Sequence, residues 1–194
     1  MEDGRPSAEA GLFALEAVVV GQPKRSRWRR YLGPALAVST VEGTPLARVT
    51  YTDDTHCLMT DASGERVVRI EQFGPAEFRF TDATDREVGT PSTGRFAKTW
   101  QLRLGTVQGR RLFLTRRGPL STEWQLTETD PDQGPAPEVL GRVTVSTVDA
   151  WIGLQQYIVE TAPALDTSER RTVIASVVCL HLLRRPPGSS SAPA

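Results

Sequence analysis

The sequence has few of the residues from which metal sites, disulfides and many active sites are built. Its 194 residues include two cysteines and two histidines. Cys57 and Cys179 lie far apart in the chain, and neither belongs to a CxxC or Cys/His spacing. The sequence therefore predicts no zinc site, no disulfide framework and no cofactor, and its cysteine usage is typical of a reducing compartment.

Net charge is absent as well. The 23 lysines and arginines balance the 23 aspartates and glutamates, so the whole chain has no general attraction for nucleic acid or for an anionic membrane. Any binding of that kind must come from a local cluster of basic residues. The composition is rich in arginine, alanine, valine and proline with little lysine, which is typical of a bacterium with a GC-rich genome.

The chain also lacks a long hydrophobic run. The longest, Val173 to Leu183, contains Ser176 and His181 and is far shorter than the roughly 20 residues of a transmembrane helix. Acidic residues at the N-terminus stand where a secretory signal would carry positive charge. We expect a cytoplasmic protein that is not transmembrane and that reaches the inner membrane surface only as a peripheral protein.

No arrangement of residues indicates an enzyme. His56 and Cys57 are neighbours in an expected strand, so their side chains point to opposite faces and cannot form a catalytic dyad. His181 is interpreted as a hydrogen-bonded structural histidine. The segment Gly89 to Phe96 lacks the lysine and hydroxyl residue of a phosphate-binding loop, and we interpret it as a turn.

Carboxylates gather near expected turns but lack the spacing of a known metal site. We interpret them as turn residues. They are Asp53, Asp54, Asp82 and Asp85.

The most frequent pattern in the middle of the chain is an alternation of apolar and polar residues. Trp100, Leu102 and Leu104 fall on one side of a strand, and Trp124 and Leu126 repeat the pattern. Segments of this kind, about twelve in number, are separated by turn residues at short intervals, which predicts a sandwich or a barrel. We expect one domain over residues 11–185, with disordered ends at 1–10 and 186–194.

Near the C-terminus the alternation of apolar and polar residues ends, and the sequence has the features of a helix. Asp166 and Glu169 have the spacing of a capping box, and no helix breaker follows until Pro186. The predicted helix, about 167–184, is apolar on nearly every side from Val173 to Leu183, so it must be surrounded by protein. The sequence therefore predicts a mainly β fold, a closed antiparallel β-barrel of about twelve strands around a hydrophobic C-terminal α-helix.

The order of these features resembles the tubby-like fold of tubby C-terminal domains, phospholipid scramblases and LURP-one-related proteins. Four segments carry the resemblance: Leu15 to Tyr31, Asp61 to Ile70, Phe78 to Gly89 and Tyr157 to Leu183. The resemblance implies a barrel that binds lipid headgroups. The basic headgroup ligands of tubby domains have no identifiable counterparts here, and the cysteine cluster and calcium-binding segment of scramblases are absent, so scramblase activity is not expected.

Two basic segments are the candidate lipid-binding sites. They comprise Lys24, Arg25, Arg27, Trp28, Arg29 and Arg30 in the first and Arg110, Arg111, Arg116 and Arg117 in the second. Cations can bind anionic phospholipid while a tryptophan lies among the headgroups. The alternative is a protein-interaction or scaffold domain whose arginines are simply solvated. Nucleic acid is not the expected partner, because Trp28 is the only aromatic residue among these candidates.

Overall fold

The computed structural model describes residues 8–23, 36–93, 101–130, 137–149 and 154–183. Within them, neighbouring strands pair antiparallel in chain order, and β1 pairs with β12 to close the barrel. The strands are β1 (Ala17–Gly21), β2 (Leu36–Ser39), β3 (Pro45–Tyr51), β4 (His56–Asp61), β5 (Arg66–Gly74), β6 (Glu77–Thr81), β7 (Glu87–Thr93), β8 (Gln101–Thr106), β9 (Arg111–Arg116), β10 (Glu123–Thr127), β11 (Val139–Asp149) and β12 (Leu154–Thr161).

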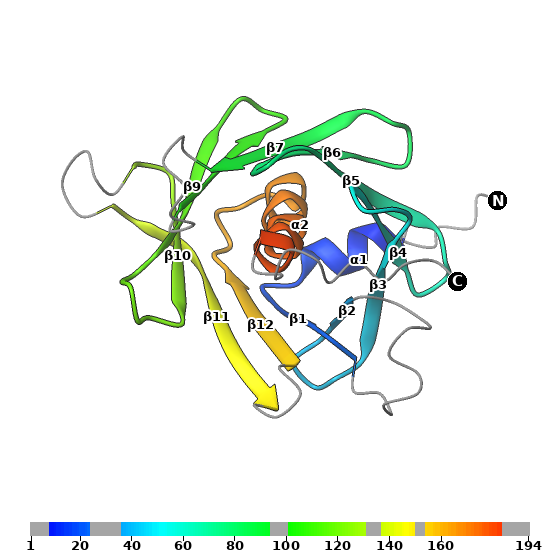
Figure 1. The fold of residues 1–194 in the computed structure, drawn as a ribbon, viewed down its shortest axis with the longest axis horizontal. Coiled ribbons are helices and arrows are strands. Elements are labelled where there is room, and N and C mark those ends of the chain that lie inside the picture. Colours follow the sequence, from blue (N-terminus) through cyan, green and yellow to red (C-terminus); the bar gives the residue numbers. More distant parts are fainter. Residues whose placement is uncertain (1–7, 24–35, 94–100, 131–136, 150–153, 184–194) are drawn as a thin grey trace.

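Two helices complete the fold, α1 (Ala8–Ala14) and α2 (Thr167–Leu183). Figure 1 shows the ring of strands enclosing both of them. The predicted closed antiparallel barrel around a C-terminal helix is therefore confirmed. In the described part of the chain, neither helix has the length and apolar character needed to cross a bilayer.

Alternation sets which side of each strand faces inward. Leu102 and Leu104 of β8 are buried while Arg103 between them is exposed, and Trp124 and Leu126 of β10 are also buried. Successive side chains of a strand point to opposite faces, so period two places one set in the barrel interior and the other in water. This was the signal that the sequence carried most clearly.

Short turns with turn-forming residues join consecutive strands, as the sequence predicted. Asp61 to Gly64 joins β4 to β5, and Gln108 and Gly109 join β8 to β9. Gly64 and Gly109 have φ values of 90° and 77°, a left-handed backbone that glycine adopts without steric cost. These positions fix the tight turns and with them the register of the flanking strands.

Helix α2 begins with the predicted capping box. The Glu169 amide donates to Asp166 Oδ1 at 2.8 Å, and the Asp166 amide donates to Glu169 Oε2 at 3.2 Å. From Thr172 to His181 every residue of the helix is buried. A helix buried on all sides requires a surrounding wall of apolar side chains, and the inward faces of the strands supply it.

Helix α1 was not predicted from the sequence. It begins at Ala8, inside the 1–10 segment expected to be disordered. Leu12 and Phe13 are 2% and 0% exposed and belong to the same core as α2. Arg170 Nη1 donates to the Ala14 carbonyl at 2.8 Å, which joins the end of α1 to α2. The barrel interior is therefore filled by two helices.

One segment predicted to be a turn is a strand. Residues 89–93, from Gly89 to Thr93, lie within β7, and Pro91 is buried. A Cβ at Gly89 would lie 2.9 Å from Thr172 Cγ2 of α2 and 3.1 Å from Phe80 Cδ2. The glycine is needed because α2 packs closely against β7 here, which the pattern of glycine, proline and hydroxyl residues did not reveal.

The up-and-down topology gives the barrel two distinct ends. At the helix-start end, defined by Thr167, lies the β8–β9 turn, since Gln108 Nε2 contacts Asp166 Oδ2 there, and β10 ends at the same end. At the far end β1, β3, β5, β7, β9 and β11 each end. Each candidate residue can therefore be assigned to one end.

Candidate functional site

The second basic cluster is divided between the two barrel ends. Arg110 and Arg111 lie where β9 begins, at the helix-start end, whereas Arg116 and Arg117 lie where β9 ends, at the far end. At about 3.4 Å per residue, the length of β9 separates Arg111 from Arg116 by about 17 Å. The four arginines therefore do not form one patch, although they are close in the sequence.

Arg110 is held by two carboxylates of the fold. Its Nη1 lies 3.1 Å from Glu169 Oε1 on α2, and its Nη2 lies 2.8 Å from Glu128 Oε2. The Glu169 side chain is only 3% exposed, so it needs a cationic partner. Hydrogen bonding from Arg110 lowers the pKa of Glu128. Arg110 therefore anchors the start of α2 and is not free to bind a headgroup.

The β9–β10 hairpin presents the other two arginines. Arg116 Nε donates to the Ser121 carbonyl at 2.7 Å, which braces the hairpin. Arg117 Nη1 lies 3.3 Å from Glu123 Oε2, and its side chain is 65% exposed. Arg117 is therefore paired within the hairpin and still accessible to a ligand.

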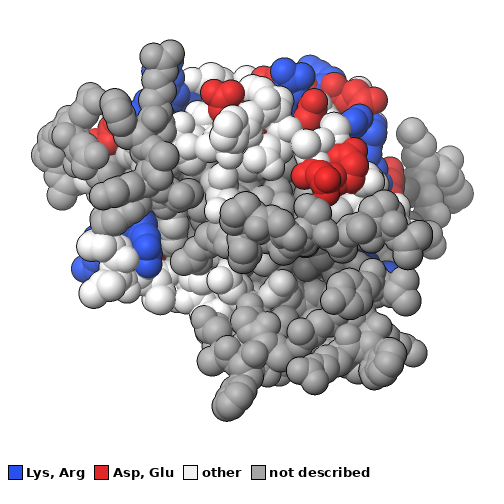
Figure 2. Space-filling model, in the orientation of Figure 1, with Lys and Arg blue, Asp and Glu red and all other residues white. Residues whose placement is uncertain are grey.

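Leu120 is a highly exposed apolar residue of this hairpin, and no pattern in the sequence marked it as a candidate. The residue is 94% exposed, against 53–56% for Val41, Phe73 and Val107. In the space-filling view, blue and white atoms lie at the lower left, where Figure 1 places the β9–β10 hairpin (Figure 2). A leucine in water beside arginines resembles the apolar and cationic pairing of membrane-surface segments.

The first basic cluster, Lys24, Arg25, Arg27, Trp28, Arg29 and Arg30, lies outside the described residues. The strands on either side of it are described. β1 ends at Gly21 and β2 begins at Leu36, both at the far end. The sequence of this cluster therefore connects two strands at the same barrel end as the β9–β10 hairpin, away from Arg110 and Arg111.

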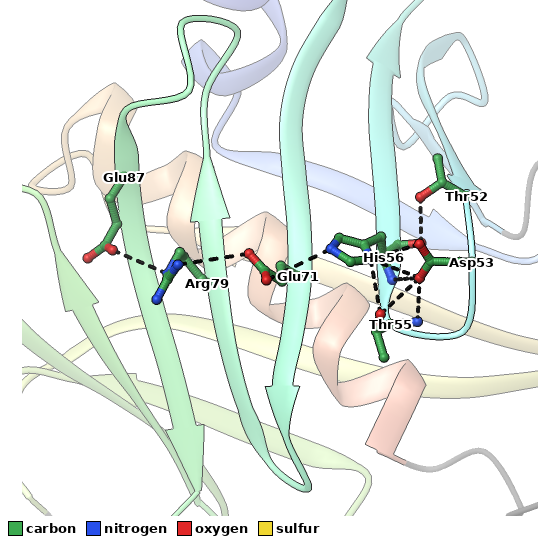
Figure 3. Close-up of polar contacts among 7 residues, drawn as sticks. All are labelled: Thr52, Asp53, Thr55, His56, Glu71, Arg79 and Glu87. Carbon is green, nitrogen blue, oxygen red and sulfur yellow. Dashed lines mark hydrogen bonds and ion pairs between the residues drawn. The ribbon is translucent and has the colours of Figure 1, made fainter.

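A row of charged side chains crosses the outer face of four strands, β4 to β7 (Figure 3). His56 Nε2 lies 3.9 Å from Glu71 Oε1, and Glu71 Oε2 lies 4.0 Å from Arg79 Nη1. Arg79 Nε lies 3.6 Å from Glu87 Oε2. Acidic and basic groups alternate along the row, so each carboxylate lies beside a basic side chain.

Asp53 ends this row in the β3–β4 turn. Its Oδ1 accepts hydrogen bonds from the Thr55 and His56 amides, both at 2.8 Å, and lies 2.8 Å from His56 Nδ1. The hydrogen bond with the His56 side chain, supported by the Thr55 amide, holds the pKa of Asp53 well below its usual range. The interpretation of Asp53 as a turn residue agrees with this geometry.

The histidines and cysteines are placed as the sequence predicted. His56 points outward and Cys57 inward, with Cys57 3% exposed. His181 is buried, and its Nδ1 lies 3.4 Å from Tyr157 Oη, as expected of a structural histidine. Burial raises the pKa of the Cys179 thiol. Within the described ranges, His, Cys, Asp and Glu form no group that could hold a metal ion.

Comparison with known proteins names no family for this chain. No protein-family model matches the chain, and no curated protein matches it. A solved X-ray structure of a protein from Arabidopsis thaliana covers 84% of this chain and 88% of its own length, with 13% identity and a TM-score of 0.48. Similarity at this level says nothing about function.

Proposed function

We propose that this barrel is a non-enzymatic module that binds an anionic membrane surface through its far end. The observation that carries the proposal is the position of Leu120, 94% exposed on a hairpin next to Arg117. Leucine can enter the boundary between headgroups and acyl chains while arginine contacts lipid phosphates. The resemblance of the sequence to tubby-like barrels supports the same function.

Stable membrane binding requires more free energy than the β9–β10 hairpin supplies. Burial of one leucine contributes about 2 kcal/mol, and each basic residue near an anionic surface contributes about 1 kcal/mol. Leu120, Arg116 and Arg117 of the hairpin together contribute a binding free energy of about 4 kcal/mol, which corresponds to a dissociation constant near 1 mM. The segment from Lys24 to Arg30 would add about 5 kcal/mol if its five cations also reach the surface. Peripheral attachment at the inner membrane surface then becomes feasible.

Co-sedimentation with neutral and anionic vesicles across a salt series tests the proposal. We expect binding only to anionic vesicles, weaker as salt rises, and a loss of about thirtyfold for Leu120→Ser, the equivalent of about 2 kcal/mol. Val107→Ser is the matched control, because Val107 is 55% exposed on the β8–β9 hairpin at the other barrel end. Absence of binding at any salt, or equal losses in the two variants, would contradict it.

A protein-interaction or scaffold domain is the second candidate. The exposed Phe73 on the outer face of β5 favours it, because a large aromatic side chain in water is a common interface anchor. Removing the charges of Arg25, Arg27, Arg29 and Arg30 separates the two candidates. Vesicle binding should collapse in that variant, whereas a protein partner on β5 should still bind.

A further inference from the structure

We infer that the far end of the barrel takes up a proton at His56 when it binds an anionic membrane, so that membrane binding is tighter at acid pH. The inference rests on the proposed function, because it assigns a regulatory group to the same end of the barrel. His56 begins β4 and borders the β3–β4 turn, residues 52–55, which joins two strands at the far end. Histidine is the side chain whose ordinary charge change falls between pH 5 and 8.

The β3–β4 turn carries negative charge at the end that faces the membrane in the proposed function. Asp53 and Asp54 are both exposed, and the turn contains no lysine or arginine. Hydrogen bonds with the His56 side chain and the Thr55 amide hold the pKa of Asp53 well below its usual range, so this carboxylate stays ionised wherever histidine titrates. The turn therefore opposes contact with anionic lipid unless a cation offsets its charge.

His56 lies between this turn and β5 (Figure 3). Its Nδ1 is 2.8 Å from both Oδ1 and Oδ2 of Asp53, and its Nε2 is 3.9 Å from Glu71 Oε1. Glu71 is the residue opposite His56 in the β4–β5 register. Each ring nitrogen therefore faces a carboxylate. The neutral ring presents an N–H group to one of them, whereas the protonated ring presents an N–H group to each.

The other groups around His56 keep their charge as the ring titrates. On the β3 side lies Thr52, whose amide and hydroxyl donate to the His56 carbonyl at 3.0 and 3.2 Å. On the β5 side, Glu71 is shared with Arg79 of β6 at 4.0 Å, and Arg79 also contacts Glu87 of β7 at 3.6 Å. The His56 side chain is 23% exposed, so a proton can reach it from water. The ring is therefore the variable charge in this part of the far end.

The membrane itself favours the protonated ring. An anionic leaflet has a surface potential of about −30 mV, which concentrates protons and lowers the pH at its surface by about half a unit. One added cation near such a surface tightens binding about fivefold, the equivalent of about 1 kcal/mol. By linkage, a proton that is taken up on binding makes binding tighter as the pH falls and weaker as the pH rises.

The test is co-sedimentation of the full chain with phosphatidylglycerol vesicles between pH 5.5 and pH 8 at constant salt. We expect the wild type to bind about fivefold more tightly at pH 5.5. His56→Gln should keep the weaker affinity across the range, and His56→Lys should keep the tighter one. His181 is buried beside Tyr157 and is present in all three proteins, so its contribution cancels from the comparison. Thermal melting checks that both variants are folded.

The outcomes separate this inference from the proposed function. Absence of binding at every pH overturns both. Binding with the same pH dependence in wild type and His56→Gln overturns the inference alone, and so does equal affinity of His56→Gln and His56→Lys. Proton NMR of the free wild-type chain needs no variant. The His56 ring signals should shift between pH 5.5 and pH 8, and a ring that stays in one protonation state over this range also overturns the inference.

Discussion

Aspartates close three of the turns by accepting hydrogen bonds from backbone amides that follow them in the chain. Asp61 Oδ1 accepts from the amides of Ser63 and Glu65, both at 2.9 Å, and Asp82 Oδ1 accepts from those of Thr84 and Arg86. In the third turn Asp53 accepts from the amides of Thr55 and His56. Hydrogen bonds to the ionised carboxylate favour it over the protonated form, so the pKa values of all three aspartates are lowered.

If the ionised Asp61 carboxylate stabilises its turn, replacement of Asp61 should cause a pH-dependent loss of stability. The Ser63 hydroxyl, which donates to Asp61 Oδ1 at 2.6 Å, is the main cause of the lowered pKa. Asp61→Ala should lower the free energy of unfolding by about 2 kcal/mol at neutral pH, measured by urea denaturation. The exposed Asp54, changed to Ala, is the control.

The sign of the pH dependence follows from the direction of the shift. A carboxyl whose pKa is lower in the folded chain stabilises the fold fully above its unfolded pKa, about 3.9. The contribution is lost as the pH falls through the folded value. The difference between wild type and Asp61→Ala should therefore be complete at pH 5 and smaller at pH 2. A difference that does not change with pH would show that the carboxylate charge has no part in the turn.

At the scale of elements, the attachment of α2 to the barrel wall depends on an ion pair. Arg110 belongs to the β8–β9 hairpin and Glu169 to the first turn of α2, which is 59 residues later. Arg110→Ala leaves the buried carboxylate without its cation and should lower stability by about 3 kcal/mol. Denaturant unfolding measures the loss. Arg111→Ala should change stability by less than about 0.5 kcal/mol, because Arg111 is exposed.

A double variant distinguishes charge from packing. If the loss arises from an unpaired carboxylate, adding Glu169→Gln to Arg110→Ala should recover part of it, since the amide has no charge to bury. A double variant less stable than Arg110→Ala would indicate that Glu169 acts mainly through its capping bond with Asp166.

The contact between α2 and β7 gives a second prediction for the elements. Gly89→Ala places a methyl group against Thr172 and Phe80 and should lower the melting temperature, with a loss of about 1–3 kcal/mol. Gly11→Ala is the matched control, because a Cβ there meets nothing within 4 Å and alanine favours the helix. Equal melting temperatures for Gly89→Ala and wild type would mean that α2 does not pack against β7 as described.

Sequence patterns predicted the elements whose signal is local. Alternation at Leu102 and Leu104 and the capping box of Asp166 and Glu169 each lie within a few residues, so strands and α2 were found. Helix α1 has seven residues, too few for a clear period. Gly89 contributes to the turn-like composition of Gly89 to Thr93, but it is required because α2, far along the chain, packs against it. Such requirements arise only in the folded chain.

In the whole molecule, the candidate site depends on how distant segments pack together, and most of it could not be predicted from the sequence. Arg110 and Arg117 look equivalent in sequence, but the topology places them at opposite ends of the barrel. Arg110 forms an ion pair with Glu169 there. Exposure singled out Leu120 and Phe73, and exposure depends on everything that packs nearby. Only the closed fold shows which residues are exposed together at the far end of the barrel.

A fluorophore on the hairpin tests the membrane proposal most directly. Cys57 and Cys179 are 3% and 0% exposed, so a thiol-reactive, polarity-sensitive dye should label Leu120→Cys selectively in the folded chain. We predict a blue shift on addition of anionic vesicles, reversed by high salt, and no shift for dye on Val107→Cys at the other barrel end. An unchanged spectrum at Leu120→Cys, or equal shifts at both positions, would contradict binding through the far end.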